Sequence, residues 1–205
     1  EEMLPLLIEW SKERKYPFSF ITEVSVNLAD DDLLMDLMIE AGFNSIFVGI
    51  ETPSTESLQE CGKSQNLKRN LVSSIKRLQE RGFIVSAGFI VGFDSDTSSV
   101  FEDQINFIQK SGIVSAMVGL LNAPSGTKLY KKLQSENRLL EIWSGNNMDG
   151  AMNFVPKMNY AQLMGGYSKI IQTIYAQKEY YTRVKRFLNN YKQPFWNKNK
   201  IKLKE

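Results

Sequence analysis

The sequence predicts an α/β fold: a partial TIM-like (β/α) barrel with parallel strands, followed by a helical C-terminal extension. Four short segments with a period of two alternate with segments whose apolar residues recur every three or four positions. Each of the four carries one apolar face and one face of small or polar residues. Barrel strands show this pattern when helices cover their outer face.

The segment 86–94 is the most informative of the four predicted strands. One of its faces is entirely apolar, and the other is small and ends in a carboxylate: Ser86, Gly88, Ile90, Gly92 and Asp94. Glycine weakens a strand and often marks the close approach of a ligand or another backbone. The alternative is a bend in the barrel wall.

The remaining elements follow from helix caps and periodicity. We expect a helix over 2–14, strands at 17–27, 45–51 and 115–121, and a helix over 67–81. Three more helices start near the aspartates 30–32, after a cap at Asp96 or Thr97, and at Lys128. Asn159 caps a long helix and another follows it, so we divide the chain into a barrel part, 1–140, and a helical extension, 141–205.

Polar residues fall at the ends of all four predicted strands: Asn27, Glu51, Gly92 with Asp94, and Asn122. The carboxyl ends of parallel barrel strands share one edge, where such folds bind ligands. The sequence therefore predicts a small-molecule site there. A polar row on the first strand, Glu23, Ser25 and Asn27, either lines the barrel interior or is the wet face of an edge strand.

The composition excludes several kinds of site. The chain has no histidine and one cysteine, Cys61, which rules out an internal disulfide, a histidine-based triad and a cysteine-rich metal site built by this chain alone. No apolar run is long enough to span a membrane, so we expect a cytoplasmic protein. Nine Lys/Arg against two Glu over 176–205 indicate a solvated helix face, or less readily contact with nucleic acid.

Three stretches carry a family resemblance: TEVSVNLADDDLLMDLMIEAGFNSIFVGIETPS, GFIVSAGFIVGFDSDT and LLNAPSGTKLYKKL. Their order and spacing resemble the radical S-adenosylmethionine (SAM) enzymes, in the branch with a cobalamin-binding domain that contains the hopanoid methylases. The residues from Asn153 to Tyr191 are similar to the C-terminal helical region of that branch.

The resemblance implies the last four strands of a six-stranded partial barrel and a SAM site along their ends. Glu51, after the pair Gly49-Ile50, matches an acidic residue near SAM. The glycine-rich strand motif matches Gly88, Ile90 and Gly92. The resemblance further places Glu23, Ser25 and Asn27 near the ribose or the methionyl group, and Asn122 near the adenine.

The chain departs from the family in lacking the CxxxCxxC loop that binds a 4Fe–4S cluster. A first residue other than methionine and an uncapped first helix favour a piece of a longer protein, whose missing N-terminal half would hold the cluster loop. The resemblance also implies a cobalamin domain there. We therefore expect a fragment of an enzyme that cleaves SAM reductively, inactive by itself. The alternative is a non-catalytic barrel that binds a small molecule or a protein. Exposed strand edges would favour self-association.

Overall fold

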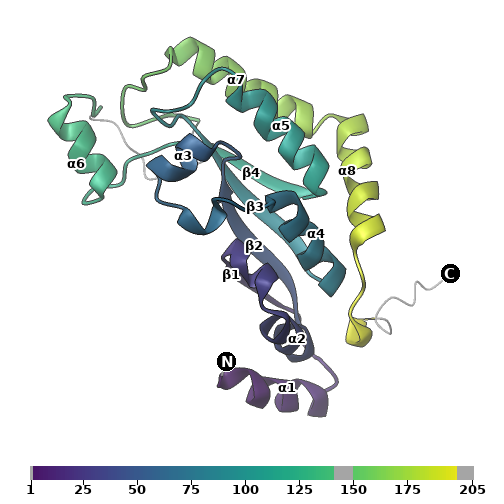
Figure 1. Ribbon diagram of the computed structural model, residues 1–205. Helices are drawn as coiled ribbons and strands as arrows, with labels where there is room; N and C mark the ends of the chain where they lie inside the picture. The colour runs from purple at the N-terminus through teal and green to yellow at the C-terminus, as the bar shows by residue number, and fades with distance from the viewer. Residues whose placement is uncertain (1, 141–149, 198–205) are drawn as a thin grey trace.

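The computed structural model describes residues 2–140 and 150–197. Its centre is a four-stranded parallel sheet in the order β1-β2-β3-β4, made by Phe20–Val24, Phe43–Glu51, Ile84–Val91 and Ser115–Leu120. The predicted α/β class, the parallel strand direction and the helical C-terminal region are confirmed (Figure 1).

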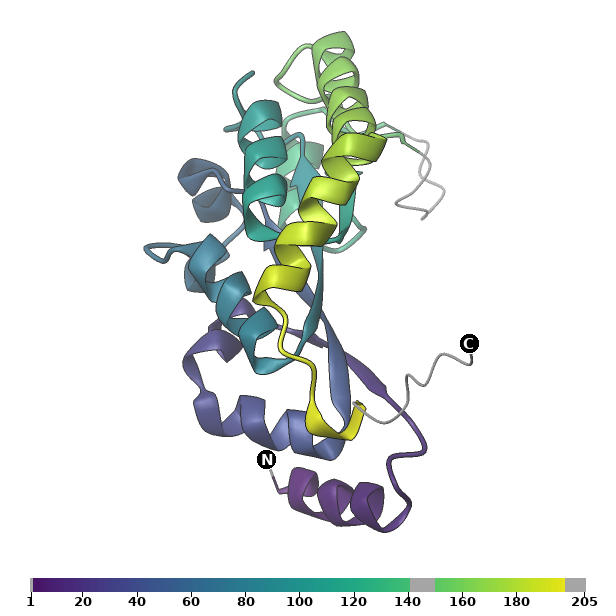
Figure 2. The same cartoon turned by 90° about the vertical axis from the view of Figure 1, so that its right-hand side faces the viewer.

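Helices cover one face of the sheet. In the barrel part α2 (Asp32–Ala41), α4 (Leu71–Arg81) and α5 (Val100–Ser111) contact the strands. There, α1 (Met3–Glu13) packs on α2, α3 (Thr55–Glu60) follows β2, and α6 (Lys128–Ser135) stands apart from the sheet (Figure 1). The helical region adds α7 (Tyr160–Ile174), which lies along α5 and contacts β4, and α8 (Gln177–Asn190), which contacts α4 and α5 (Figures 1 and 2).

The core lies between the sheet and this helical layer. Alternate strand residues point into it and are buried: Ile46, Val48, Ile50, Val85, Ala87, Phe89, Val91, Ala116, Val118 and Leu120. The other sheet face is open, and Ile21, Ile84 and Met117 on it are 70%, 38% and 54% exposed. The apolar face of each strand therefore packs against the helices and the other face lies on the open side of the sheet, as the alternation in the sequence predicts.

Most helix ends follow the predicted capping chemistry. The side chain of Asp31 accepts a hydrogen bond from the N–H of Leu34, and that of Asn159 accepts one from Gln162. Gly42, Gly82 and Gly112 end their helices in the left-handed conformation that suits glycine.

Three predictions of local structure are wrong. The first strand ends at Val24, because the chain turns into a 3₁₀ helix, η1 (Val26–Asp30), that buries Val26 in the core. The helix predicted over 67–81 begins at Leu71, where the side chain of Asn70 caps it, and α3 and a 3₁₀ turn, η2 (Ser64–Asn66), precede it.

The predicted cap of α5 is the third error. Neither Asp96 nor Thr97 caps this helix, which starts at Val100 after Ser99. The Asp96 carboxylate instead accepts hydrogen bonds from the N–H groups of Gly92 and Phe93, at 2.8 and 3.1 Å, and from the Ser57 hydroxyl. It therefore fixes the turn that follows β3.

Candidate functional site

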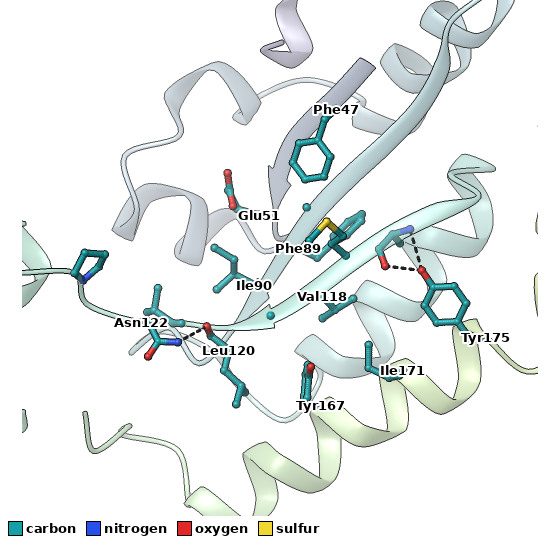
Figure 3. A pocket seen from close by; sticks show the side chains of 16 residues that line it. Phe47, Glu51, Phe89, Ile90, Val118, Leu120, Asn122, Tyr167, Ile171 and Tyr175 are labelled. Atoms are coloured by element: carbon teal, nitrogen blue, oxygen red, sulfur yellow. Dashed lines mark hydrogen bonds between the residues drawn. The ribbon is translucent and has the colours of Figure 1, made fainter. Parts of the chain in front are cut away.

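A pocket of about 570 Å³ opens where the strands end and continues along β4. From the open face of the sheet it is lined by Phe47, Glu51, Gly88, Ile90 and Gly119, and from β4 and α7 by Val118, Leu120, Tyr167, Ile171 and Tyr175 (Figure 3). Asn122 and Pro124, from the loop after β4, line it as well. Four residues predicted from the sequence, Glu51, Gly88, Ile90 and Asn122, are thus brought together.

Glu51 is held at the end of β2 by an ion pair. Its carboxylate lies 2.8 Å from the Nζ atom of Lys63, and the two side chains are 16% and 33% exposed. Glu51 has a positive φ of 65°, which is uncommon for a residue other than glycine. Asn66, just before α4, donates to the carbonyls of Gly49 and Ile50 at 3.2 and 3.0 Å and so fixes the strand end.

Gly49 leaves room for this ion pair. A β-carbon on Gly49 would lie 2.6 Å from the Glu51 carboxylate and 2.9 Å from the Lys63 ammonium. Lys63 is the residue that the sequence analysis missed. The signal that could have found it is a lone lysine shortly after the strand that ends in Glu51.

Gly88 and Gly92 serve different purposes. Gly88 lines the pocket, where a β-carbon would meet the ring of Phe47 at 3.0 Å. Gly92 has a φ of 107° and faces the helical layer, since a β-carbon there would meet Met152 at 3.0 Å. The expectation that Gly88 and Gly92 both border the same ligand pocket is therefore wrong for Gly92. A glycine is required at position 92 because the turn after β3 has a positive φ there.

Asn122 is engaged within the chain. Its amide nitrogen donates to the carbonyls of Leu120 and Ala151 at 3.3 and 3.2 Å, and its oxygen accepts from the N–H of Asn153 at 3.0 Å. The side chain of Asn153 in turn pairs with both backbone groups of Ala123. Asn122 thus ties the loop after β4 to the start of the helical region, while still bordering the pocket.

The predicted polar row of the first strand lies elsewhere. Ser25 and Asn27 line a separate hollow of about 300 Å³ beside α2, and Glu23 is exposed on the open sheet face. Asn27 lies in η1 because the strand ends early. Glu51, Gly92 and Asn27 therefore do not converge on one point, although a contribution of Glu23, Ser25 and Asn27 to ligand binding stays a prediction.

The charged groups around the turn after β3 are strongly coupled. Hydrogen bonds from Arg138, with help from Lys132, hold the pKa of Asp94 well below its usual range. Burial raises the pKa of Asp96, although Ser57 and the N–H groups of Gly92 and Phe93 oppose that shift. Glu60 accepts hydrogen bonds from the N–H groups of Asp94 and Ser95 at 3.1 and 2.9 Å.

The described residues do not supply a metal centre. Within 2–140 and 150–197 no group of three or more His, Cys, Asp or Glu side chains could hold a metal ion. Burial raises the pKa of the Cys61 thiol, so this cysteine stays protonated near neutral pH. The chain therefore does not fit a 4Fe–4S cluster, which needs several thiolates. Nor is any of the described helices long and apolar enough to cross a membrane.

Comparison with known proteins supports the interpretation of the strands. Residues 127–205 match a family model described as a domain of unknown function, DUF4070. The chain is 37% identical over 182 residues to an uncharacterized methyltransferase, sll1242, of Synechocystis, covering 88% of the chain and 34% of the relative. It is 34% identical over 139 residues to the hopanoid C-2 methylase of Rhodopseudomonas palustris, covering 68% of the chain and 26% of the relative.

A more distant relative is the bacteriochlorophyllide d C-8(2)-methyltransferase of Chlorobaculum tepidum, at 22% identity over 78% of the chain and 36% of the relative. The chain spans between about a quarter and a little over a third of the length of these three relatives. With its strand motifs, these similarities place the chain in the radical SAM superfamily. Within that superfamily it belongs to the branch of the hopanoid methylases.

Proposed function

We propose that the chain is the C-terminal part of a radical SAM methyltransferase and that it forms the SAM-binding edge of the enzyme's partial barrel. The observation that carries this proposal is the pocket at the carboxyl ends of β2, β3 and β4, in a chain related to methyltransferases over most of its length. Ligands bind at this edge in barrels with parallel strands.

The residues at this end of the pocket suit a nucleoside with a charged tail. Gly88, Ile90 and Gly119 give a flat, largely apolar surface on which a base can lie. Glu51 lines this end of the pocket with a carboxylate, and its ion-pair partner Lys63 lies 2.8 Å from it. Hydroxyl, amino and carboxyl groups of SAM can form hydrogen bonds with such a pair.

Reductive cleavage of SAM needs a 4Fe–4S cluster, and the residues of this chain do not fit one. In the proposal the cluster, and any cobalamin, is held by residues outside these 205, and the chain alone is inactive. The small-molecule substrate enters from the same edge. The reaction takes place in the cytoplasm, where the chain is expected from its composition.

The test uses the full-length protein with its cluster reconstituted. At Gly119 a β-carbon would have no heavy atom within 4 Å, so Gly119→Val extends into the pocket without disturbing the fold. We expect this variant and Glu51→Gln to bind SAM at least tenfold more weakly, with unchanged cluster content. Ser115→Val, on the same face of β4 but outside the pocket, is the control and should bind SAM normally.

Equilibrium binding of SAM and release of 5′-deoxyadenosine are the two measurements. The proposal is wrong if the wild-type protein forms no 5′-deoxyadenosine, or if Gly119→Val binds SAM as tightly as the wild type does. In that case the barrel is a non-catalytic binding domain.

A further inference from the structure

The outer face of α8 carries positive charge that the described residues leave unpaired. Lys178, Lys185 and Arg186 are exposed on this helix, and Lys192 is exposed just after its end. None of the four forms an ion pair with any residue that the structure describes. The excess of lysine and arginine near the C-terminal end of the sequence is therefore displayed on the folded surface.

Two large apolar side chains lie among these charges. Lys178, Tyr181, Lys185 and Leu188 follow one another at intervals of three, four and three residues, which places them on one side of the helix. The side chains of Tyr181 and Leu188 are 57% and 61% exposed. The four residues are called the α8 strip below. A helix face that meets only water normally carries polar residues throughout, so the two apolar side chains indicate a partner.

The fold holds α8 by its other side. Arg183 is fully buried and donates to Gln109 of α5 at 2.7 Å, and the Asn190 amide donates to Gln79 of α4 at 3.0 Å. Glu179, the only acidic residue of α8, accepts a hydrogen bond from Gln109 as well. Figure 2 shows α8 on the outside of the helical layer. The α8 strip is thus held outward by a helix that does not need it for folding.

We propose that the α8 strip is a membrane-contact surface that binds the anionic headgroups of a phospholipid bilayer. Its two lysines lie about 10 Å apart along the helix axis, so a flat anionic surface can contact both at once. Tyr181 and Leu188 then reach the boundary between headgroups and acyl chains, where such side chains are stabilised. Basic clusters beside a surface helix are attracted to anionic lipids. Four more lysines follow in the sequence: Lys198, Lys200, Lys202 and Lys204.

A bilayer fits the α8 strip better than a nucleic acid does. Both supply negative charge, but the phosphate backbone that dominates binding to nucleic acids has no apolar layer to cover Leu188. The surface is also compatible with a ligand in the pocket. Because α8 packs on α4 and α5, it lies on the helical side of the sheet, and no residue of the α8 strip lines the pocket. Membrane contact therefore does not depend on the proposed SAM site.

The experiment measures cosedimentation of the full-length protein with phosphatidylcholine vesicles in which one lipid in three is phosphatidylglycerol, at physiological salt. Lys178→Gln combined with Lys185→Gln should weaken binding at least tenfold, since each lysine near an anionic surface contributes about fivefold. Lys178→Arg with Lys185→Arg keeps the charge and should bind as the wild type does. Lys128→Gln with Lys131→Gln is the control, because it removes the same charge from exposed positions of α6, far from α8 (Figure 1), and should change binding less than threefold.

A further pair of variants separates a bilayer from a nucleic acid. Leu188→Gln should weaken vesicle binding severalfold, whereas Leu33→Gln, at a 70% exposed position of α2, should leave it unchanged. The proposal is overturned if the wild type does not bind the anionic vesicles, or if the double glutamine variant on α8 or Leu188→Gln binds them as the wild type does. Tighter binding to duplex DNA than to vesicles, with no effect of Leu188→Gln, would assign the strip to a nucleic acid instead.

Discussion

At the scale of single residues, Asp94 shows how one carboxylate joins two parts of the chain. It follows β3 and is 9% exposed, and it pairs with Arg138 at 2.7 Å and with Lys132 at 2.7 Å. Arg138 also donates through Nε to the carbonyl of Val155, so the cluster links the strand end, α6 and the start of the helical region. Its charges are satisfied within the protein, which indicates a structural role.

The first prediction concerns the pH dependence of this cluster. A carboxyl group whose pKa is lowered by folding stabilises the protein fully above its unfolded pKa, about 3.9. Its contribution is lost as the pH falls through the lower folded pKa. We expect Asp94→Asn to lower the free energy of unfolding by about 2 kcal/mol at pH 7, since the partly buried charge of Arg138 loses its buried partner and keeps the more exposed Glu136, while Lys132 is half-exposed.

Urea unfolding of the wild type and of Asp94→Asn at pH 7, 4 and 2.5 measures this difference. The difference in stability between wild type and variant should be largest at pH 7, slightly smaller at pH 4, where the unfolded carboxyl is partly protonated, and smaller again at pH 2.5. Asp103→Asn, an exposed carboxylate in the first turn of α5, is the control and should change stability little. A difference that grows as the pH falls would contradict the assignment of a lowered pKa to Asp94.

At the same scale, several residues that line the pocket could be predicted from the sequence, but the contacts that hold the strand ends could not. Glu51, Gly88, Ile90 and Asn122 share a pocket because strand parity and strand ends are local properties of the sequence. That Gly92 faces the helical layer depends on a turn held by Asp96, which a strand pattern does not contain. The partnership of Lys63 with Glu51 depends on the path of the chain through α3 and η2, and is also non-local.

At the scale of elements, α7 carries two adjacent glycines, Gly165 and Gly166, and only Gly166 contacts α5. Gly166 lies under the ring of the buried residue Phe101, whose three outermost carbons would overlap a β-carbon on Gly166. The adjacent Gly165 has open space around it. The close approach of these two helices, which closes the α7 side of the pocket, therefore depends on Gly166 alone of the pair.

The second prediction compares the two glycines. Gly166→Ala should destabilise the protein by about 1–3 kcal/mol, because the Phe101 ring must shift within a packed core. Gly165→Ala should raise stability by up to about 1 kcal/mol, since alanine favours an exposed helix more than glycine does. Thermal and urea unfolding of both variants provide the measurement, and equal effects of the two substitutions would show that the helices are not in close contact at Gly166.

The third prediction concerns the attachment of α8. Arg183 is fully buried, donates to Gln109, to the carbonyl of Ile174 at 2.6 Å and to that of Val114 at 3.1 Å, and lies over the rings of Tyr175 and Tyr180. Burial lowers its pKa, yet a guanidinium remains charged at neutral pH. Arg183→Ala should cost about 3 kcal/mol or more, because buried acceptors lose their donors.

Arg183→Lys keeps the charge, but a lysine cannot donate to all three acceptors. We therefore expect it to lower the free energy of unfolding by less than Arg183→Ala does. Arg186→Ala, at an exposed position of the same helix, should change the unfolding free energy by less than about 0.5 kcal/mol. If Arg183→Ala were as stable as Arg186→Ala in urea unfolding, the buried guanidinium would not anchor α8.

The elements themselves were largely predictable. Periodicity and caps gave seven of the eight α-helices of the described residues and all four strands. The helix that the sequence analysis missed, α3, has six residues, which are too few to show a repeating apolar pattern. The early end of β1 was not predictable because Val26 continues the strand pattern, and only the packing of η1 on the core diverts it.

At the scale of the whole molecule, one face of the sheet is left without a covering layer of helices and exposes apolar side chains. Ile21, Ile84 and Met117 are exposed on three different strands of this face. In a barrel such side chains face inward and are covered by other strands. An apolar sheet face left in water favours association with whatever apolar surface it meets.

The fourth prediction is that the 205-residue chain self-associates through this face. Sedimentation velocity over a hundredfold range of concentration should show oligomers at the upper end. Ile21→Glu combined with Met117→Glu should shift the chain toward the monomer, because two like charges would face each other across a desolvated contact. Leu33→Glu removes an equally exposed apolar residue, 70% exposed on α2, and should leave association unchanged. Dissociation by Leu33→Glu alone would place the contact on the helical side, and the open sheet face would then have no share in it.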